Sequence, residues 1–309
     1  MKFGRYPGVE APCSGLAQGY TRMIHPMKTT LPLLALSLFA SALHAAEPIP
    51  ESHRANGIAI GCQAYTFNRF TVFEAIEKTA AAGAKVIEFY PGQKLSPSEP
   101  DLKLDHNASP ETLAKVKAKL AEHGILPVAY GVVGLSKDEA ECRKVFEFAK
   151  TFGIRVINTE SVDALDTFEK LVKEYDIKVG FHNHPKREND PNYKVWDPEY
   201  ILTLVKDRDP RIGACADTGH WMRSGLKPIE CLRLLKGRVV SSHLKDLNGF
   251  GKGVHDVPYG TGEAGMAGLL AELKAQGFDG PASIEYEHNW ENSLPEVTEC
   301  VAFVKAWKP

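Results

Sequence analysis

The chain has 309 residues and a formal net charge of −2. Residues 1–46 carry four basic side chains and one acidic one, so removing their net +3 leaves −5 for the rest of the chain. A mildly acidic protein lacks the basic surface with which proteins bind nucleic acid or anionic membranes. We therefore expect neither nucleic acid nor a membrane as a partner of the mature protein.

A short apolar segment near the N-terminus is typical of a secretory signal peptide. Lys28 precedes an apolar run from Leu31 to Ala42, and small residues follow up to Ala46. This run is too short to span a bilayer, for which about 20 residues are needed. We predict a signal peptide at about residues 27–45, a leader that ends at residue 46, and a periplasmic or secreted mature protein.

Cysteine usage gives no sign of a disulfide framework. An odd number of cysteines remains after residue 46, and they are scattered along the chain. Two of them, Cys62 and Cys215, lie in apolar strand-like runs, and we expect these two to be small core residues. The five cysteines are Cys62, Cys142, Cys215, Cys231 and Cys300.

Beyond residue 46 the chain alternates strand-like and helix-like stretches without a linker between them. Short β-rich runs are each followed by a stretch with helical spacing, such as the apolar face of Leu113, Val116 and Leu120. Alternation at this spacing predicts a parallel sheet. The eight predicted strands are residues 58–65, 84–90, 126–132, 154–158, 178–182, 212–216, 239–243 and 282–286.

The expected helix boundaries are marked by capping residues. Ser109 and Asp197 each place a capping oxygen directly before a proline in the first turn. Ser136 and Glu139 have the spacing of a capping box. Glycines then end helices ahead of the next strand or turn, at Gly83, Gly124, Gly153 and Gly277.

Eight βα units favour a closed (β/α)8 TIM barrel of the α/β class, with one domain over residues 47–309. That length is close to the roughly 250 residues typical of this fold. An open doubly wound sheet is the alternative. The first strand leads into Cys62–Phe67, which has no glycine-rich turn for a dinucleotide phosphate, so we prefer the barrel.

Ionisable side chains gather at the C-terminal ends of the predicted strands, the face at which barrel enzymes carry their chemistry. Carboxylates and imidazoles that converge there would repel one another and lose solvation unless a cation neutralised them. Oxygen and imidazole donors without a thiolate predict one divalent ion, Mn, Mg, Co or Zn. The set comprises Glu88, Glu160, His182–His184, Asp217–His220, His243–Asp246 and Glu285–His288.

The sequence resembles the xylose isomerase-like TIM barrel superfamily, which includes sugar phosphate and ketose isomerases and epimerases, inosose dehydratase and related sugar lyases. The resemblance covers about residues 58–307 and rests on six motifs in order. These are Ile60–Tyr65, Gly180–His184, Ala216–His220, Ser242–Asp246, Tyr259–Glu263 and Ser283–Glu285.

Ketose epimerases of that superfamily bind a metal through Glu, Asp, His and Glu from strands five to eight. The resemblance implies that Asp217, His243 and Glu285 are three of the ligands here. At strand five this chain has His182 in place of the glutamate, which removes one of the two carboxylates that pass a proton in the epimerases. We expect Glu160, one strand earlier, to be the fourth ligand. The alternative that His182 binds the metal or acts as a base stays open.

Several of these side chains have a structural alternative. Glu88 could be a buried acid paired with a barrel cation, Lys245 could form an ion pair with Asp246, and Tyr65 and Trp221 could pack in the core. We predict catalytic roles for Glu160, His182, Glu285 and Lys245, and substrate contacts for Glu88, His184, His220, Tyr65 and Trp221.

The expected function is that of a sugar isomerase or epimerase. A metal ion would acidify the C–H bond next to a substrate carbonyl and stabilise the resulting enediolate. One alternative is a dehydratase, hydratase or lyase that acts on keto-sugars or 3-keto-glycosides with the same site. A second is a non-catalytic exported sugar-binding protein. The sequence leaves open whether the chain forms a homo-oligomer.

Overall fold

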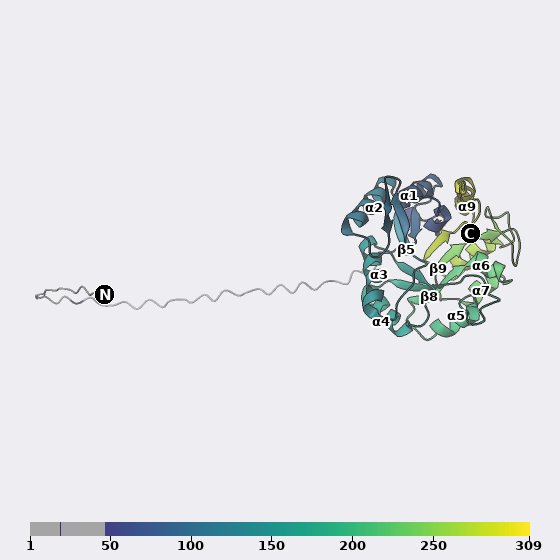
Figure 1. Cartoon of the computed structure of the whole chain (residues 1–309). Coiled ribbons are helices and arrows are strands. Elements are labelled where there is room, and N and C mark those ends of the chain that lie inside the picture. Colours follow the sequence, from purple (N-terminus) through teal and green to yellow (C-terminus); the bar gives the residue numbers. More distant parts are fainter. Residues whose placement is uncertain (1–18, 20–46) are drawn as a thin grey trace, which may run out of the picture. The chain divides into compact units, whose positions relative to one another are not determined.

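Eight parallel strands close into a barrel in the computed structural model, which describes residue 19 and residues 47–309 (Figure 1). The predicted signal peptide at about residues 27–45 lies outside the described residues. The order around the barrel is β1-β12-β9-β8-β7-β6-β5-β2, as predicted for a (β/α)8 fold. The strands are β1 (Ala59–Gln63), β2 (Val86–Phe89), β5 (Leu126–Tyr130), β6 (Val156–Thr159), β7 (Lys178–His182), β8 (Ile212–Asp217), β9 (Val239–Leu244) and β12 (Pro281–Ile284).

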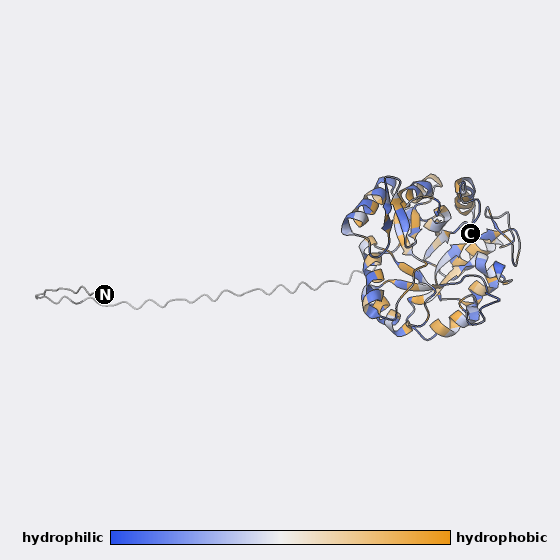
Figure 2. Ribbon diagram, in the orientation of Figure 1, coloured by the Kyte–Doolittle hydropathy of each residue, from blue (hydrophilic) through white to orange (hydrophobic). Residues whose placement is uncertain are grey.

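Helices surround this barrel and turn their apolar faces toward it. In Figure 2 the strands carry hydrophobic stretches, while the surrounding helices are mixed in colour, as expected for amphipathic helices. None of the helices in the described part of the chain is long and apolar enough to cross a membrane. The helices are α1 (Val72–Ala81), α2 (Pro110–His123), α3 (Glu139–Phe152), α4 (Leu165–Tyr175), α5 (Pro198–Val205), α6 (Thr218–Arg223), α7 (Pro228–Leu234), α8 (Met266–Ala275) and α9 (Leu294–Ala306).

Most of the predicted helix boundaries are confirmed. The Ser109 and Asp197 side chains cap α2 and α5, and Gly124 ends α2 in the left-handed region that glycine favours. The capping box predicted at Ser136 is wrong. Asp138 caps α3 instead, because its carboxylate, two residues closer to the helix, accepts from the first free backbone N–H groups.

Two small antiparallel hairpins interrupt the loops that follow barrel strands. The first pairs β3 (Gln93–Ser96) with β4 (Glu99–Leu104), and the second pairs β10 (Asp246–Leu247) with β11 (Asp256–Val257). The sequence did not predict the first hairpin, because β4 is mostly exposed and lacks the alternating apolar pattern of a half-buried strand.

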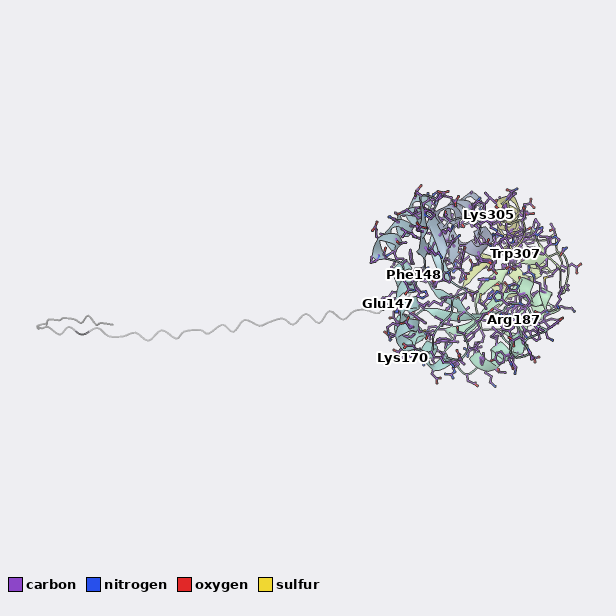
Figure 3. The ribbon with its side chains drawn as sticks, viewed as in Figure 1. Glu147, Phe148, Lys170, Arg187, Lys305 and Trp307 are labelled. Carbon is purple, nitrogen blue, oxygen red and sulfur yellow. The ribbon has the colours of Figure 1, made fainter. Side chains whose placement is uncertain are left out.

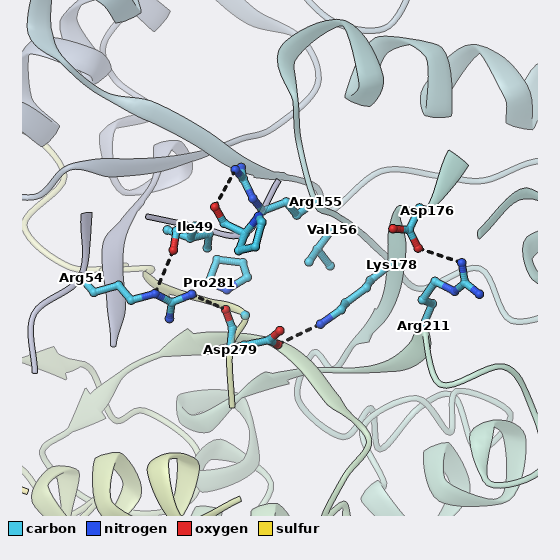
Figure 4. Close-up of a pocket in the computed structure, with 11 residues that line it drawn as sticks. Ile49, Arg54, Arg155, Val156, Asp176, Lys178, Arg211, Asp279 and Pro281 are labelled. Carbon is cyan, nitrogen blue, oxygen red and sulfur yellow. Dashed lines mark hydrogen bonds and ion pairs between the residues drawn. The ribbon is translucent and has the colours of Figure 1, made fainter. Parts of the chain in front are cut away.

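At the N-terminal end of the barrel, a cavity of about 180 Å³ is lined by basic side chains whose charges already have partners (Figure 4). Lys178 Nζ lies 2.9 Å from Asp279, and Arg211 Nη1 lies 2.8 Å from Asp176. Arg54 donates to the backbone carbonyl of Ile49, whose side chain is buried at this end. Because these cations are satisfied within the chain, the functional site is expected at the opposite end of the strands.

All five cysteines after residue 46 are free and buried, which confirms the core positions predicted for Cys62 and Cys215. They occupy strands and helices of the core rather than the strand ends. Burial raises the pKa of the Cys62 thiol to about 12, so it stays protonated near neutral pH. This thiol therefore plays no part in the chemistry of the candidate site below.

Candidate active site

Three of the predicted ligands come together at the C-terminal ends of neighbouring strands. In the barrel register Asp217 of β8 lies beside His243 of β9, and Glu285 follows the end of β12 on the other side of His243. His243 Nδ1 lies 3.2 Å from Glu285 Oε2 and 4.0 Å from Asp217 Oδ2. Parallel strands of one barrel therefore bring together residues that are far apart in the sequence.

His182 joins this group from β7. Its Nε2 lies 3.4 Å from Asp217 Oδ2, and ligand atoms of His182, Asp217, His220 and Glu285 all lie within 4.8 Å of one another. Both ring nitrogens of His182 and Asp217 Oδ2 are buried without a hydrogen-bond partner. Unsatisfied buried polar atoms are costly, so this donor set fits a bound divalent ion.

Glu160 belongs to a second group, which shares only His182 with the first. Its carboxylate is hydrogen-bonded to His184 Nδ1 and accepts from Tyr193 Oη at 3.1 Å, while His182 Nδ1 lies 3.8 Å away. Arg187, labelled in Figure 3, lies 3.6 Å from its second oxygen. The geometry therefore places His182, and not Glu160, with the Asp217 and Glu285 carboxylates.

The neighbours of Glu160 also fix its charge. Burial opposes ionisation of this carboxyl, but the neighbouring imidazoles of His182 and His184 outweigh burial and hold its pKa well below the usual value. His182 responds in the opposite direction. Burial lowers its pKa, but Asp217 and Glu160 together raise it to about 9. Glu160 is therefore an anion that orients two imidazoles.

Lys245 places a cation among the carboxylates. Its ammonium lies 2.9 Å from Asp217 Oδ2, 2.7 Å from Glu285 Oε2 and 2.9 Å from Glu287 Oε2. Burial would lower the pKa of Lys245, but Asp217 and Glu285 raise it well above the ordinary value. The ammonium is therefore charged at neutral pH. The alternative ion pair with Asp246 is wrong.

Asp246 has a different task, which explains the glycines of the Tyr259–Glu263 motif. Its carboxylate accepts hydrogen bonds from the backbone N–H groups of Gly260, Gly262 and Ala264 at 2.8, 3.1 and 2.9 Å. A Cβ at Gly262 would lie 2.4 Å from Asp246 Oδ1. The motif therefore folds a loop around Asp246 and leaves Lys245 free to turn into the barrel.

His220 is held between two cations. Arg223 Nη1 lies 3.0 Å from His220 Nδ1, and Lys245 Nζ lies 3.4 Å from Nε2. Arginine and lysine side chains can only donate, so both ring nitrogens of His220 face donors. Burial and the nearby Lys245 hold the pKa of His220 well below its usual value, although Asp217 opposes them. His220 is therefore neutral at neutral pH, and one of its ring nitrogens belongs to the group of possible metal ligands around Asp217.

Glu88 is hydrogen-bonded to the ring of His243. It is fully buried, and its oxygens are engaged by His243 Nε2 at 3.0 Å, Asn158 Nδ2 at 2.8 Å and Ser283 Oγ at 2.7 Å. A ligating histidine typically donates its other ring N–H to such a carboxylate, which orients the ring. The structure thus favours the buried, paired acid over the predicted substrate contact.

A cavity of about 290 Å³ opens beside this group, a size close to that of small-molecule pockets. His184 and Glu285 line its polar side, and Tyr65 and Tyr90 line its aromatic side. Tyr65 is 40% exposed and contacts Tyr90 and Trp290 edge-on. Trp221 is 1% exposed and packs in the hydrophobic core, so the structure favours core packing over the predicted substrate contact.

Two side chains that contact the site residues, Asn183 and Arg223, were not predicted from the sequence. Asn183 accepts from the Asp217 N–H at 2.9 Å and donates to the Asp217 carbonyl at 3.0 Å. Arg223 contacts Glu287 and lies 2.9 Å from Asp256. Asn183 stands between two predicted site histidines, a signal that could have drawn attention to it. Arg223 carries no such signal.

The fold and the site define a (β/α)8-barrel protein with a candidate metal centre at the C-terminal ends of its strands. A family model for xylose isomerase-like TIM barrels matches residues 76–306, and the chain belongs to that family. No curated protein matches the chain.

Solved structures with the same fold include sugar epimerases. A crystal structure from Parabacteroides distasonis ATCC 8503, of a protein without an assigned function, is 31% identical with a TM-score of 0.64 and covers 81% of this chain and 98% of its own. A D-tagatose 3-epimerase-like protein is 18% identical with a TM-score of 0.61, covering 80% and 96%. D-allulose 3-epimerase from Methylomonas sp. is 16% identical with a TM-score of 0.61, covering 83% and 99%. At these lower identities the likeness shows the fold.

Proposed function

We propose that this protein is a divalent-metal-dependent enzyme of the sugar isomerase or epimerase type, which moves a proton next to the carbonyl of a sugar. The observation that carries the proposal is the convergence of His182, Asp217, His220 and Glu285 beside a cavity, with His243 Nδ1 next to the Asp217 and Glu285 carboxylates. A divalent ion held there would polarise the substrate carbonyl and make the neighbouring C–H bond more acidic.

His184 is the side chain best placed to take that proton. It lines the cavity, its side chain is 42% exposed, and its Nδ1 is hydrogen-bonded to Glu160. A histidine oriented by a carboxylate is the usual arrangement of a general base. The proton moves from the substrate carbon to Nε2 of His184. Its return to the neighbouring carbon gives isomerisation, whereas epimerisation requires a second acid that delivers a proton to the other face of the enediolate.

A lyase or dehydratase acting on keto-sugars or 3-keto-glycosides is the second candidate. His182 stands where the ketose epimerases of the superfamily have one of the two carboxylates of their proton relay. A single histidine–glutamate base suits proton removal followed by loss of a leaving group from the adjacent carbon, which needs no second base. The predicted export of the protein supports this candidate, because free sugars and glycosides are the substrates that an exported enzyme meets.

Deuterium exchange tests the shared first step. The purified protein with Mn or Co is incubated in D₂O with a panel of ketoses and 3-keto-glycosides, and incorporation is followed by NMR. We expect exchange at one carbon, its loss in His184→Gln, and its retention in His53→Gln at the opposite end of the barrel. Metal bound without exchange into any substrate would favour the non-catalytic sugar-binding protein.

Export itself is a separate proposal. We propose that the leader up to about residue 46 is removed and that the mature protein is periplasmic or secreted. N-terminal sequencing of the protein from cell fractions tests this, with a start near residue 47 expected. A cytoplasmic protein that retains residues 27–45 would contradict it.

A further inference from the structure

The candidate metal centre already contains a cation of the chain. The Lys245 ammonium lies within 3 Å of one oxygen each of Asp217, Glu285 and Glu287, and its side chain has no exposed surface. Asp217 Oδ2 lies 2.9 Å from Nζ, but the two atoms do not have hydrogen-bonding geometry. This oxygen is therefore buried without a hydrogen bond and is available to a metal ion. The same Asp217 and Glu285 are the carboxylates that would hold a divalent ion.

Contacts with Thr218 and Gly219 fix the position of the Lys245 side chain. Thr218 Oγ1 accepts from the Lys245 backbone N–H at 2.8 Å and donates to its carbonyl at 2.9 Å. A Cβ at Gly219 would lie 2.7 Å from Cβ and Cδ of Lys245, so the stem passes where only a glycine leaves room. The position of the ammonium is therefore set by the Asp217–His220 motif, one strand away.

We propose that Lys245 is the resident counter-ion of the Asp217–Glu285 pair and competes with the divalent ion for it. This inference rests on the proposed metal centre. Two cations cannot share the same oxygens without strong repulsion, because a metal lies about 2.0–2.2 Å from its carboxylate ligands. Metal binding therefore displaces the ammonium from these two oxygens toward Glu287, which is the most exposed of its three partners.

Competition of this kind has a functional consequence. While the centre is empty, Lys245 neutralises the buried carboxylates and stabilises the metal-free protein. The free energy needed to displace the ammonium is subtracted from the binding free energy of the metal ion. Only an ion that binds the carboxylates more strongly than the ammonium does can therefore occupy the centre. The second group of possible ligands, Glu160, His182 and His184, lacks a contact with Lys245 and would escape this competition.

Cobalt titration of Lys245→Met tests the inference without any substrate. Co²⁺ binding is followed by calorimetry and by the visible absorption of the ion, beside wild type and Lys252→Met. Lys252 is a matched control because its side chain is 74% exposed and pairs with Glu188. We expect Lys245→Met to bind Co²⁺ at least ten-fold more tightly than wild type and to have a lower Tm in chelator, with Lys252→Met unchanged in both.

Equal or weaker Co²⁺ binding by Lys245→Met would overturn the inference and place the ion away from this lysine. Absence of Co²⁺ binding by both proteins would overturn it as well. If Lys245→Met does not fold, Lys245→Gln removes the charge but keeps a polar end, and the same tightening is expected. Deuterium exchange separates the two proposals: tighter binding without exchange refutes the proposed function alone, and exchange without tighter binding refutes the competition alone.

Discussion

Removal of the Asn183 side chain should destabilise the protein and weaken the metal centre together. Asn183 makes two buried hydrogen bonds to the backbone of Asp217, at 2.9 and 3.0 Å, and the two residues are 3% and 0% exposed. In Asn183→Ala the Asp217 N–H loses its partner, whereas the Asp217 carbonyl, at the N-cap of α6, keeps its helical hydrogen bond. A buried unsatisfied group costs about 1–3 kcal/mol, so the free energy of unfolding should fall by about 1–3 kcal/mol.

Thermal unfolding measures this effect. For a chain of this size about 1 kcal/mol corresponds to roughly 2–4 °C, so Tm should fall by at least about 2 °C. Calorimetric Co²⁺ titration should show weaker binding, because the Asp217 carboxylate is no longer fixed by its backbone. Asn192→Ala, on an exposed loop, is the control and should change neither value. A Tm of Asn183→Ala within about 1 °C of wild type would refute this reasoning.

Three further substitutions test other parts of the site. Gly262→Ala places a Cβ against the Asp246 carboxylate and should cost about 1–3 kcal/mol of stability, read from denaturant unfolding; an unchanged midpoint would contradict the tight fit. Glu88→Gln loosens the orientation of His243 and should weaken Co²⁺ binding about 10–100-fold, whereas a substrate-binding Glu88 would leave the titration unchanged. Glu160→Gln should slow deuterium exchange by about 10²–10⁴-fold while one Co²⁺ still binds; loss of the metal instead would make Glu160 a ligand.

The sequence predicted the barrel because its signals are local. The alternation of strands and helices, the capping residues Ser109 and Asp197 and the glycines that end helices act within a few residues of one another. Ser136 shows the limit of such signals. Where two capping residues stand close together, as Ser136 and Asp138 do, the competition is decided by geometry that the spacing does not contain.

The part of the site that could be predicted from the sequence is the set of residues at the C-terminal ends of the strands. Parallel strands place their C-terminal residues on one face, so the sequence alone was enough to expect Asp217, His243 and Glu285 near one another. Glu160 shows where this expectation fails. Its strand end lies on the same face, but its carboxylate turns to His184 and Tyr193, a choice made by side-chain hydrogen bonds.

The sequence by itself thus determined the fold class, the face that carries the site and the need for positive charge among its acids. Only the tertiary structure decided which cation meets that need inside the chain, since Lys245 contacts carboxylates from other strands. It also decided that Glu88 supports His243 and that Trp221 packs in the core. The physical reason is that order along a strand is written in the sequence, whereas contacts across a barrel depend on strand register and side-chain rotamers.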